Sequence, residues 1–397
     1  MKKYTPFICA ISFLIGGAFV YFLGHLQQRK TDAKPSPVTA VDRQGSPMAD
    51  RVQLTLDAGL QKIVEAELDK SFATLHPKKI IAVLADPRTG EILAMANRPA
   101  PAGASTPQLD AVSFSYEPGS TFKVLSYAGV LMNGLGDDKS QIFCENGSFP
   151  LEGKMIKDHA PLGNQTPSEI LMRSSNIGAA KMALKLGATK YCELVQNFGF
   201  GHETGVGLQG ESGGAIIPKE KVDDLTLARM SFGQGVSVTP LQLLMAYGAI
   251  ANGGILFRPS MTLNQSGTKQ SGQRIMPEGV AASLREALKL AVTDQGTGPL
   301  AQVNGLQVAG KTGTSQAVTS DGGHSETEYV TSFAGYFPAD HPQVVAVVVV
   351  DGASVPADSN YGGLIAAPIF AAIAKQSASY LHLSPSVGNL SSQNDSL

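Results

Sequence analysis

The stretch Val344-Val345-Ala346-Val347-Val348-Val349-Val350 is an unbroken apolar run near the carboxyl end of the chain. A strand with one solvent-facing side alternates apolar and polar residues, so this run predicts a central strand that is buried on both faces. The residues before it predict two more strands, at 306–316 and 329–337, and the residues after it predict a final helix at 366–379.

The other end of the chain also predicts strands. Segments 79–85 and 91–96 flank the turn Asp86-Pro87-Arg88-Thr89-Gly90, which predicts a β-hairpin. Alternating apolar residues predict a further strand at 51–56, and Asp57 is the expected N-cap of an amphipathic helix at 58–75.

Segment 118–300 is mostly helical in pattern, with glycine-rich loops. Strands from both chain ends therefore flank a helical insert. The simplest architecture is α+β: one antiparallel sheet flanked by the first and last helices, with the insert forming a helical lobe beside it. Functional sites often lie in a cleft between two such parts.

Composition narrows the function classes. The chain has 397 residues, is 43% hydrophobic and only 16% charged, and carries a formal net charge of −2. This balance provides no basic field, which argues against nucleic-acid binding. Three cysteines are too few for a disulfide scaffold or a zinc cluster, and no His/Cys ligand cluster is visible, so no metal site is expected.

The amino-terminal segment predicts a membrane anchor. Residues 6–24 carry no charge and are long enough to cross a bilayer. A cleaved signal peptide is the alternative, with Gly16-Gly17-Ala18 as its cleavage site, but the apolar run continues beyond that site. The expected organisation is a cytoplasmic tip and anchor at 1–26, a flexible linker at 27–50, a catalytic domain at 51–385 and a disordered tail at 386–397.

The segment Glu117-Pro118-Gly119-Ser120-Thr121-Phe122-Lys123 places a serine and a lysine at a predicted helix start. Lys123 is the only charge in a largely apolar helix, and a buried lysine is costly unless it is paired or neutral. Ser120 and Lys123, three residues apart, share one helix face, where the first turn also has unpaired N–H groups. This turn thus combines a nucleophile, a candidate base and an oxyanion donor, although S-x-x-K alone has low specificity.

Two further motifs are weak when taken singly. Ser174-Ser175-Asn176 precedes a helical pattern and reads by itself as a polar loop or cap. Lys311-Thr312-Gly313-Thr314 lies on a predicted strand, where glycine permits the close approach of another backbone. Together with Ser120 and Lys123, they form the ordered set S-x-x-K, S-x-N and K-T-G, with each motif on the element that acyl transfer requires.

With these three motifs, the chain resembles the transpeptidase module of class B penicillin-binding proteins, of the cell-division or elongation type. The resemblance extends from about residue 52 to residue 385 and implies the penicillin-binding transpeptidase or serine β-lactamase-like fold. It also covers the segments Ser231–Gln242, Ala251–Gly254, Tyr361–Gly363 and Ala366–Pro368.

The resemblance implies peptidoglycan cross-linking through a serine acyl-enzyme, without a cofactor. Ser120 would attack the penultimate D-alanine of a D-Ala-D-Ala stem peptide, and neutral Lys123 would accept its proton. Ser174 would relay a proton, and Asn176 would hydrogen-bond the substrate amide. A second stem peptide would supply the acceptor amine, and β-lactams would act as inhibitors.

The third motif is implied to bind substrate. Lys311, Thr312 and Thr314 would hold the terminal carboxylate, with Gly313 between them, because a cation and two hydroxyls suit that group. The N–H groups of Ser120 and Thr314 would form the oxyanion hole.

The resemblance also implies a single-pass protein of the cytoplasmic membrane with its catalytic domain on the outer face. A membrane glycan polymerase and other cell-wall proteins are the implied partners. Class B members usually carry a pedestal domain between the anchor and the transpeptidase module, whereas only the linker 27–50 stands there in this sequence. Pedestal-based docking therefore does not carry over, and a role in septation, elongation or spore-wall synthesis stays open.

Three rival functions use the same motifs. A class A β-lactamase needs a deacylating glutamate in an E-x-x-L-N type segment, and none occurs between Ser174 and Lys311. A class D enzyme has a hydrophobic residue in place of Asn176 and relies on tryptophan, which this chain lacks. A D,D-carboxypeptidase differs only in using water as the acceptor, and a non-catalytic β-lactam sensor or scaffold would not need all three motifs intact.

Overall fold

The computed structural model describes residues 54–99, 109–263, 271–319 and 322–383. The predicted anchor, linker and tail, at 1–26, 27–50 and 386–397, lie outside the described residues. Within the described ranges, no helix is both long and apolar enough to cross a membrane.

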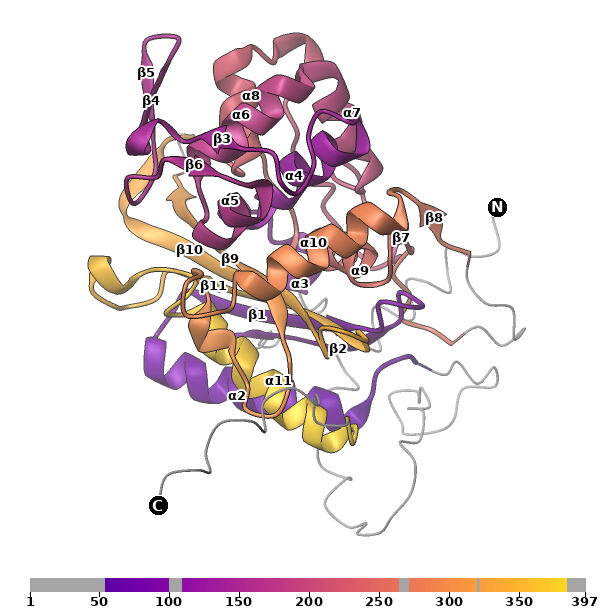
Figure 1. Cartoon of the computed structure of the whole chain (residues 1–397). Helices are drawn as coiled ribbons and strands as arrows, with labels where there is room; N and C mark the ends of the chain where they lie inside the picture. Colours follow the sequence, from indigo (N-terminus) through magenta and orange to yellow (C-terminus); the bar gives the residue numbers. More distant parts are fainter. Residues whose placement is uncertain (1–53, 100–108, 264–270, 320–321, 384–397) are drawn as a thin grey trace, which may run out of the picture.

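Five antiparallel strands form the central sheet in the order β2–β1–β11–β10–β9 (Figure 1). The strands are β1 (Lys79–Ala85), β2 (Ile92–Arg98), β9 (Ala309–Val318), β10 (His324–Phe337) and β11 (Val344–Asp351). Strand β11 pairs with β1 on one side and β10 on the other, so two strands from near the start of the fold are joined to three from its end.

Both faces of β11 are buried, which confirms the reading of its apolar run. Val345, Val347 and Val349 belong to the core shared with the helical lobe. Val344 and Val348 belong to a second core beneath the first and last helices. The run lacks alternation because each face of the strand meets a separate apolar layer.

Helices α2 (Ala58–Leu75) and α11 (Ala366–Tyr380) cover one face of the sheet, below it in Figure 1. The predicted N-cap is confirmed: Asp57 Oδ1 accepts hydrogen bonds from the N–H groups of Gly59 at 2.8 Å and Leu60 at 3.0 Å. These helices originate from opposite ends of the described chain and pack against each other as well as against the sheet.

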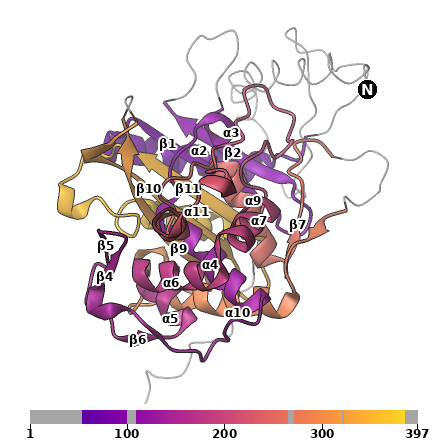
Figure 2. The same ribbon diagram turned by 90° about the horizontal axis from the view of Figure 1, so that it is seen from above.

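The helical lobe lies on the opposite face, and Figure 2 shows it from above. Helix α9 (Pro240–Ala251) packs directly on β1, β10 and β11, and every one of its residues is buried. The other lobe helices are α3 (Asp110–Ser113), η2 (Gly119–Phe122), α4 (Lys123–Met132), α5 (Pro167–Arg173), α6 (Asn176–Leu186), α7 (Ala188–Asn197), η4 (Lys219–Lys221), α8 (Asp224–Ser231) and α10 (Glu278–Leu290).

Short elements complete the fold. Three two-stranded sheets are formed by β3 (Ile142–Phe143) with β6 (Asn164–Gln165), β4 (Ser148–Leu151) with β5 (Lys154–Lys157), and β7 (Ile255–Leu256) with β8 (Gln273–Arg274). Single 3₁₀ turns lie at η3 (Glu145–Gly147), η5 (Pro299–Ala301) and η6 (Ala357–Ser359). The predicted α+β architecture with an inserted helical lobe is confirmed.

Some predicted boundaries were wrong. In the described part of 51–56, Leu54 forms only an isolated bridge with Thr262, because this segment lies against residues 260–262 instead of joining the five-stranded sheet. The strand predicted at 306–316 begins at Ala309 and runs to Val318, since Leu306 bridges back to Val303 before the sheet is reached.

Candidate active site

Ser120 lies on a 3₁₀ turn, η2, that leads directly into α4, so the predicted helix start is a tighter turn than an α-helix. Gly119 has φ +55, and a Cβ atom there would lie 2.6 Å from the carbonyl oxygen of Thr314 on β9. Glycine is therefore needed for both the backbone conformation and the close approach. This contact places the backbone beside Ser120 against the K-T-G strand.

Lys123 is the first residue of α4 and is fully buried. Its Nζ atom lies 2.9 Å from Ser120 Oγ, 3.0 Å from Ser174 Oγ and 2.5 Å from the Ser174 carbonyl oxygen. A neutral amine has two N–H donors and one lone pair. Two donated bonds to Ser174 leave the lone pair for the hydroxyl proton of Ser120, which is the arrangement of a general base.

The electrostatics favour that neutral form. Burial lowers the pKa of Lys123 well below its ordinary value, and the nearby Lys311 cation lowers it further. The carboxylate of Asp158 acts in the opposite direction and raises this pKa. The combined effect of burial and Lys311 on the pKa of Lys123 is thus larger than that of Asp158. A lysine that acts as a base at neutral pH needs such a lowered pKa.

Ser174 joins α5 to α6 in the left-handed conformation, with φ 61 and ψ 39. This conformation is uncommon for serine and turns both the carbonyl and hydroxyl oxygens towards Lys123. Ser175 caps α6 by accepting a bond from the N–H of Gly178 at 2.9 Å. The side-chain amide of Asn176 donates to the Lys157 carbonyl oxygen at 2.9 Å, which uses one of its two N–H hydrogens.

Lys311 extends from the edge strand β9 and is also fully buried. Its Nζ lies 3.2 Å from each of three oxygens: Thr297 Oγ1, Thr312 Oγ1 and the Thr312 carbonyl. Burial lowers the pKa of Lys311 to about 7. A buried cation held by neutral oxygens is suited to receive an anion, because an anionic partner would restore its charged form.

The rest of the K-T-G strand is fixed from both faces. A Cβ atom on Gly313 would lie 2.3 Å from Ser332 Oγ and 2.7 Å from the Pro118 carbonyl oxygen, so the nucleophile turn packs directly on this residue. Thr314 Oγ1 accepts a bond from the N–H of Gly362 at 3.0 Å, which leaves its hydroxyl hydrogen for another acceptor. The structure therefore brings the three predicted motifs together.

Four residues that were not among the predicted site residues also shape the site. Thr297 shares a hydrogen bond of 2.7 Å with Thr312 and contacts Lys311. Glu117 accepts a bond from the Gly235 N–H at 2.8 Å and contacts His324. The remaining two are Asp158, whose carboxylate accepts hydrogen bonds at the start of α6, and His159, whose ring meets that of Tyr361.

His159 lies at the site, although its neighbours on the chain gave no sign of this. Burial lowers the pKa of His159, and the nearby amines of Lys123 and Lys311 lower it further when they are charged, whereas Asp158 raises it. The His159 ring meets Tyr361 edge to face, with centroids 6.1 Å apart. Only the folded chain brings these two rings together, because they are contributed by the lobe and by the segment before α11.

The chain belongs to the penicillin-binding protein transpeptidase domain family. The family model, described as "Penicillin binding protein transpeptidase domain", matches residues 80–375. This match confirms the resemblance on which the site was first interpreted, and class B proteins are among the relatives.

Stage V sporulation protein D of Bacillus subtilis is 35% identical over 377 residues, covering 89% of this chain and 58% of that protein. The peptidoglycan D,D-transpeptidase FtsI of Escherichia coli K12 is 33% identical over 335 residues, covering 83% of this chain and 56% of that protein. The chain thus spans somewhat more than half the length of these two curated relatives.

Solved structures agree with this assignment. The transpeptidase domain of penicillin-binding protein 3 from Burkholderia pseudomallei superposes with a TM-score of 0.78 at 29% identity, over 84% of this chain and 97% of that one. Penicillin-binding protein 3 from Mycobacterium tuberculosis, solved with aztreonam, has a TM-score of 0.73 at 28% identity, over 87% of this chain and 88% of that one.

Proposed function

We propose that this chain is a peptidoglycan D,D-transpeptidase, which cross-links stem peptides through an acyl-enzyme on Ser120 and is inhibited by β-lactams. The observation that carries the proposal is the position of Lys123 Nζ, within 3.0 Å of both Ser120 Oγ and Ser174 Oγ on a fully buried side chain. Membership of the transpeptidase family supports the same conclusion.

In the first step, Ser120 Oγ attacks the carbonyl carbon of the penultimate D-alanine while Lys123 accepts the hydroxyl proton. The bond to the terminal D-alanine breaks, and its nitrogen leaves as an amine with the proton relayed through Lys123 and Ser174. The N–H groups of Ser120 and Thr314 stabilise the oxyanion, and the contact between Gly119 and Thr314 supports this pairing. Asn176 binds the substrate amide.

In the second step, the amine of another stem peptide attacks the acyl-enzyme and gives up a proton to Lys123. A new amide forms as the ester bond to Ser120 Oγ breaks, and Lys123 returns the proton to that oxygen, which restores the hydroxyl. The terminal carboxylate of the donor lies against Lys311 and the hydroxyls of Thr312 and Thr314 during the first step, and it departs with the released D-alanine before the acceptor amine attacks. Since the pKa of Lys311 is about 7 without this ligand, carboxylate binding raises it and draws the lysine into its charged form.

The proposal extends to the location of the enzyme. Segment 6–24 is the expected single membrane span, and the proposed topology has the transpeptidase domain on the outer face of the cytoplasmic membrane, as the family resemblance implies, with the linker 27–50 between them. A membrane glycan polymerase and other cell-wall proteins are the proposed partners, because cross-linking acts on strands that such a polymerase makes.

Labelling with a fluorescent penicillin tests the acyl-enzyme. Wild-type protein should gain one covalent adduct by intact mass spectrometry, lasting minutes or longer, whereas Ser120→Ala should gain none. Rapid consumption of the drug without a lasting adduct would favour a β-lactamase instead.

The second step needs a separate assay, with a stem pentapeptide donor and an amine-bearing acceptor peptide. A transpeptidase gives the cross-linked dimer, whereas a D,D-carboxypeptidase releases D-alanine and leaves a tetrapeptide. Donor hydrolysis without any dimer would contradict transfer as the main activity, and labelling of Ser120→Ala would contradict the nucleophile itself.

A further inference from the structure

The Asp158 carboxylate accepts three hydrogen bonds beside the S-x-N loop. Asp158 follows β5 at the base of the β4–β5 hairpin. Its Oδ2 accepts a bond from Ser175 Oγ at 2.6 Å. Its Oδ1 accepts bonds from the N–H groups of Asn176 at 2.6 Å and Ile177 at 3.1 Å. A single side chain from outside α6 therefore satisfies three donors at the start of that helix.

These bonds hold the residues next to Ser174. The N–H of Ser174 is bonded to the Leu171 carbonyl at 3.3 Å, and the N–H of Ser175 is bonded to the Ile170 carbonyl at 3.0 Å, so α5 fixes the loop from one side. Asp158 fixes it from the other side through Ser175 and Asn176. A serine in the left-handed region stays there only when its surroundings hold it.

We propose that Asp158 is a positioning residue for the reaction of Ser120, acting through Ser175 and the first turn of α6 to hold Ser174 against Lys123. The inference rests on the proposed function, because Ser174 matters only if Lys123 activates Ser120. Asp158 touches no reacting atom in this arrangement. It sets the geometry of the loop whose two oxygens contact the Lys123 amine.

The charge of Asp158 gives this role a distinctive signature. The charged or titratable groups acting on Lys123 are Lys311 on β9, Asp158 beside α6 and the adjacent His159. Of these, only the Asp158 carboxylate stabilises the ammonium form of Lys123. Loss of that charge therefore moves the pKa of Lys123 lower still, so the acid limb of an acylation profile shifts to lower pH.

The test is the second-order rate of acylation by benzylpenicillin, measured against pH for full-length protein. Asp158→Asn keeps the shape of the side chain but removes the charge and one acceptor. We expect the rate at neutral pH to fall by about 10- to 100-fold, because a misplaced catalytic group loses about this much, and the acid limb to move to lower pH. Asp158→Glu keeps the charge, so its acid limb should stay in place while its rate falls.

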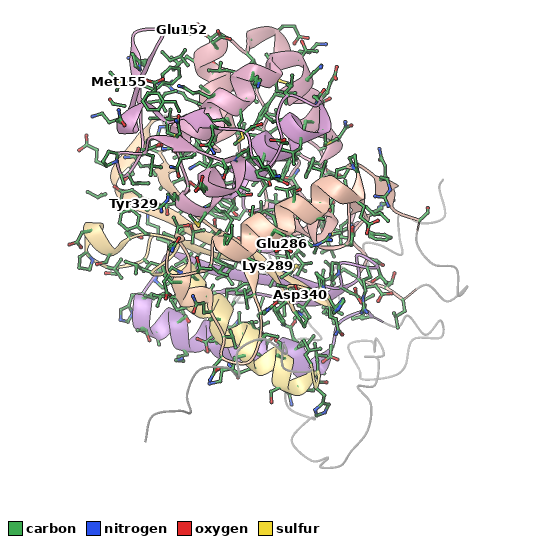
Figure 3. All side chains as sticks on the ribbon, viewed as in Figure 1. Glu152, Met155, Glu286, Lys289, Tyr329 and Asp340 are labelled. Carbon is green, nitrogen blue, oxygen red and sulfur yellow. The ribbon has the colours of Figure 1, made fainter. Side chains whose placement is uncertain are left out.

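Glu152→Gln is the matched control, because it removes a carboxylate from the same hairpin. Figure 3 shows Glu152 with Met155 at the outer end of the β4–β5 hairpin. Glu152 accepts one bond, from the N–H of Leu225 at 3.3 Å. This variant should acylate at the wild-type rate with an unmoved pH profile.

The outcomes separate the two proposals. Wild-type protein that takes no penicillin would overturn the proposed function and this inference with it. If wild type is acylated but Asp158→Asn matches it in rate and profile, only the positioning role fails. A slower Asp158→Asn with an unmoved acid limb also overturns it, because reduced packing alone would then explain the loss. If Asp158→Asn does not fold, Asp158→Glu provides the test. Its acid limb should stay where it is in wild type, and a shifted acid limb would overturn the inference.

Discussion

Lys123 and Lys311 are two fully buried lysines with different surroundings. Lys123 contacts the hydroxyls of Ser120 and Ser174, whereas Lys311 contacts those of Thr297 and Thr312. Burial lowers the pKa of both side chains. Only Lys123 lies beside the nucleophile, so a proton-transfer role belongs to Lys123 and an anion-binding role to Lys311.

Lys123→Arg should reduce the acylation rate by several orders of magnitude although it keeps a positive charge. Arginine stays protonated at every working pH and cannot accept the proton of Ser120. Stopped-flow acylation with a fluorescent penicillin measures the loss, and Lys185→Arg on the exposed side of α6 is the control. Near-normal acylation of Lys123→Arg would show that this lysine acts only through its charge.

Lys311→Met should unfold at a higher temperature than wild type near neutral pH while losing acylation. The pKa of Lys311 falls from 10.5 in the unfolded chain to about 7 in the fold, so the unfolded state binds the extra proton between these values. Wild-type stability therefore rises with pH across this window, and the full penalty is present below about pH 7.

The advantage of Lys311→Met should amount to a few degrees in Tm near pH 7 and should shrink as pH approaches about 10. Thermal unfolding followed by circular dichroism at several pH values measures it. An advantage that stays constant, or grows, as the pH rises would contradict the assignment of the stability difference to lysine desolvation.

At the scale of elements, Glu117 joins the segment before η2 to two distant parts of the chain. Its carboxylate accepts a bond from the Gly235 N–H at 2.8 Å and lies 3.1 Å from His324 Nε2 at the start of β10. The Ser315 hydroxyl donates to the Glu117 carbonyl oxygen at 2.8 Å, which ties β9 to the same point. This residue therefore aligns the nucleophile turn with the edge strand.

Glu117→Ala should destabilise the fold by about 1–3 kcal/mol, because it leaves the Gly235 N–H without its acceptor. The partner substitution His324→Ala should cost at most about 1 kcal/mol, since His324 is 42% exposed while Glu117 is only 8% exposed. Urea unfolding of both variants measures the difference. Equal losses would mean that the contact between His324 and Glu117, and not the bond from the buried carboxylate to Gly235, holds these elements together.

The elements that could be predicted from sequence are those whose signal is local. The valine run of β11, the Asp57 cap and the hairpin around Asp86–Gly90 each depend on residues within one short window. The ends of β9 and the loss of a strand before Asp57 depended instead on what each segment meets across space. Periodicity carries no information about that.

The site divides in the same way. Ser120, Lys123, Ser174 and Lys311 stand in motifs whose spacing carries chemistry. Asp158 stands in no such motif, because the groups that donate hydrogen bonds to it lie 17 to 19 residues further along the chain. They come within reach only when the β4–β5 hairpin folds back. The sequence around Thr297 likewise gives no sign of its role, since the hydroxyl that it contacts belongs to Thr312, 15 residues away on another element.

At the scale of the whole molecule, the described fold begins beyond the predicted anchor and linker. Removal of residues 1–30 should therefore give protein that leaves the membrane fraction yet still binds penicillin at the wild-type rate. The same deletion should abolish cross-linking in the cell, because confinement near the membrane raises the effective concentration of enzyme and strands. Fractionation with penicillin labelling tests the first part, and complementation tests the second.

A lengthened linker tests the geometry itself. The predicted linker of about 24 residues would reach roughly 25–30 Å as a flexible chain and would therefore set the height of the domain above the bilayer. Cross-linking in the cell should decline as inert spacers are added. The prediction is contradicted if the anchorless form complements fully and cross-linking does not change with spacer length. Height above the membrane would then have no effect on cross-linking.

The pairing of β1 with β11 also constrains the order in which the chain can fold. Ala85 and Val345 are partners, so the whole helical lobe must be synthesised before the sheet can close. At 5–20 residues per second, the β1–β2 hairpin would wait roughly 10 to 50 seconds with one apolar edge open. Late closure of so distant a pair makes folding slow and exposes that edge to mispairing. Chains stalled before Val344 should therefore remain protease-sensitive at β1, whereas chains with β11 fully emerged should resist cleavage there.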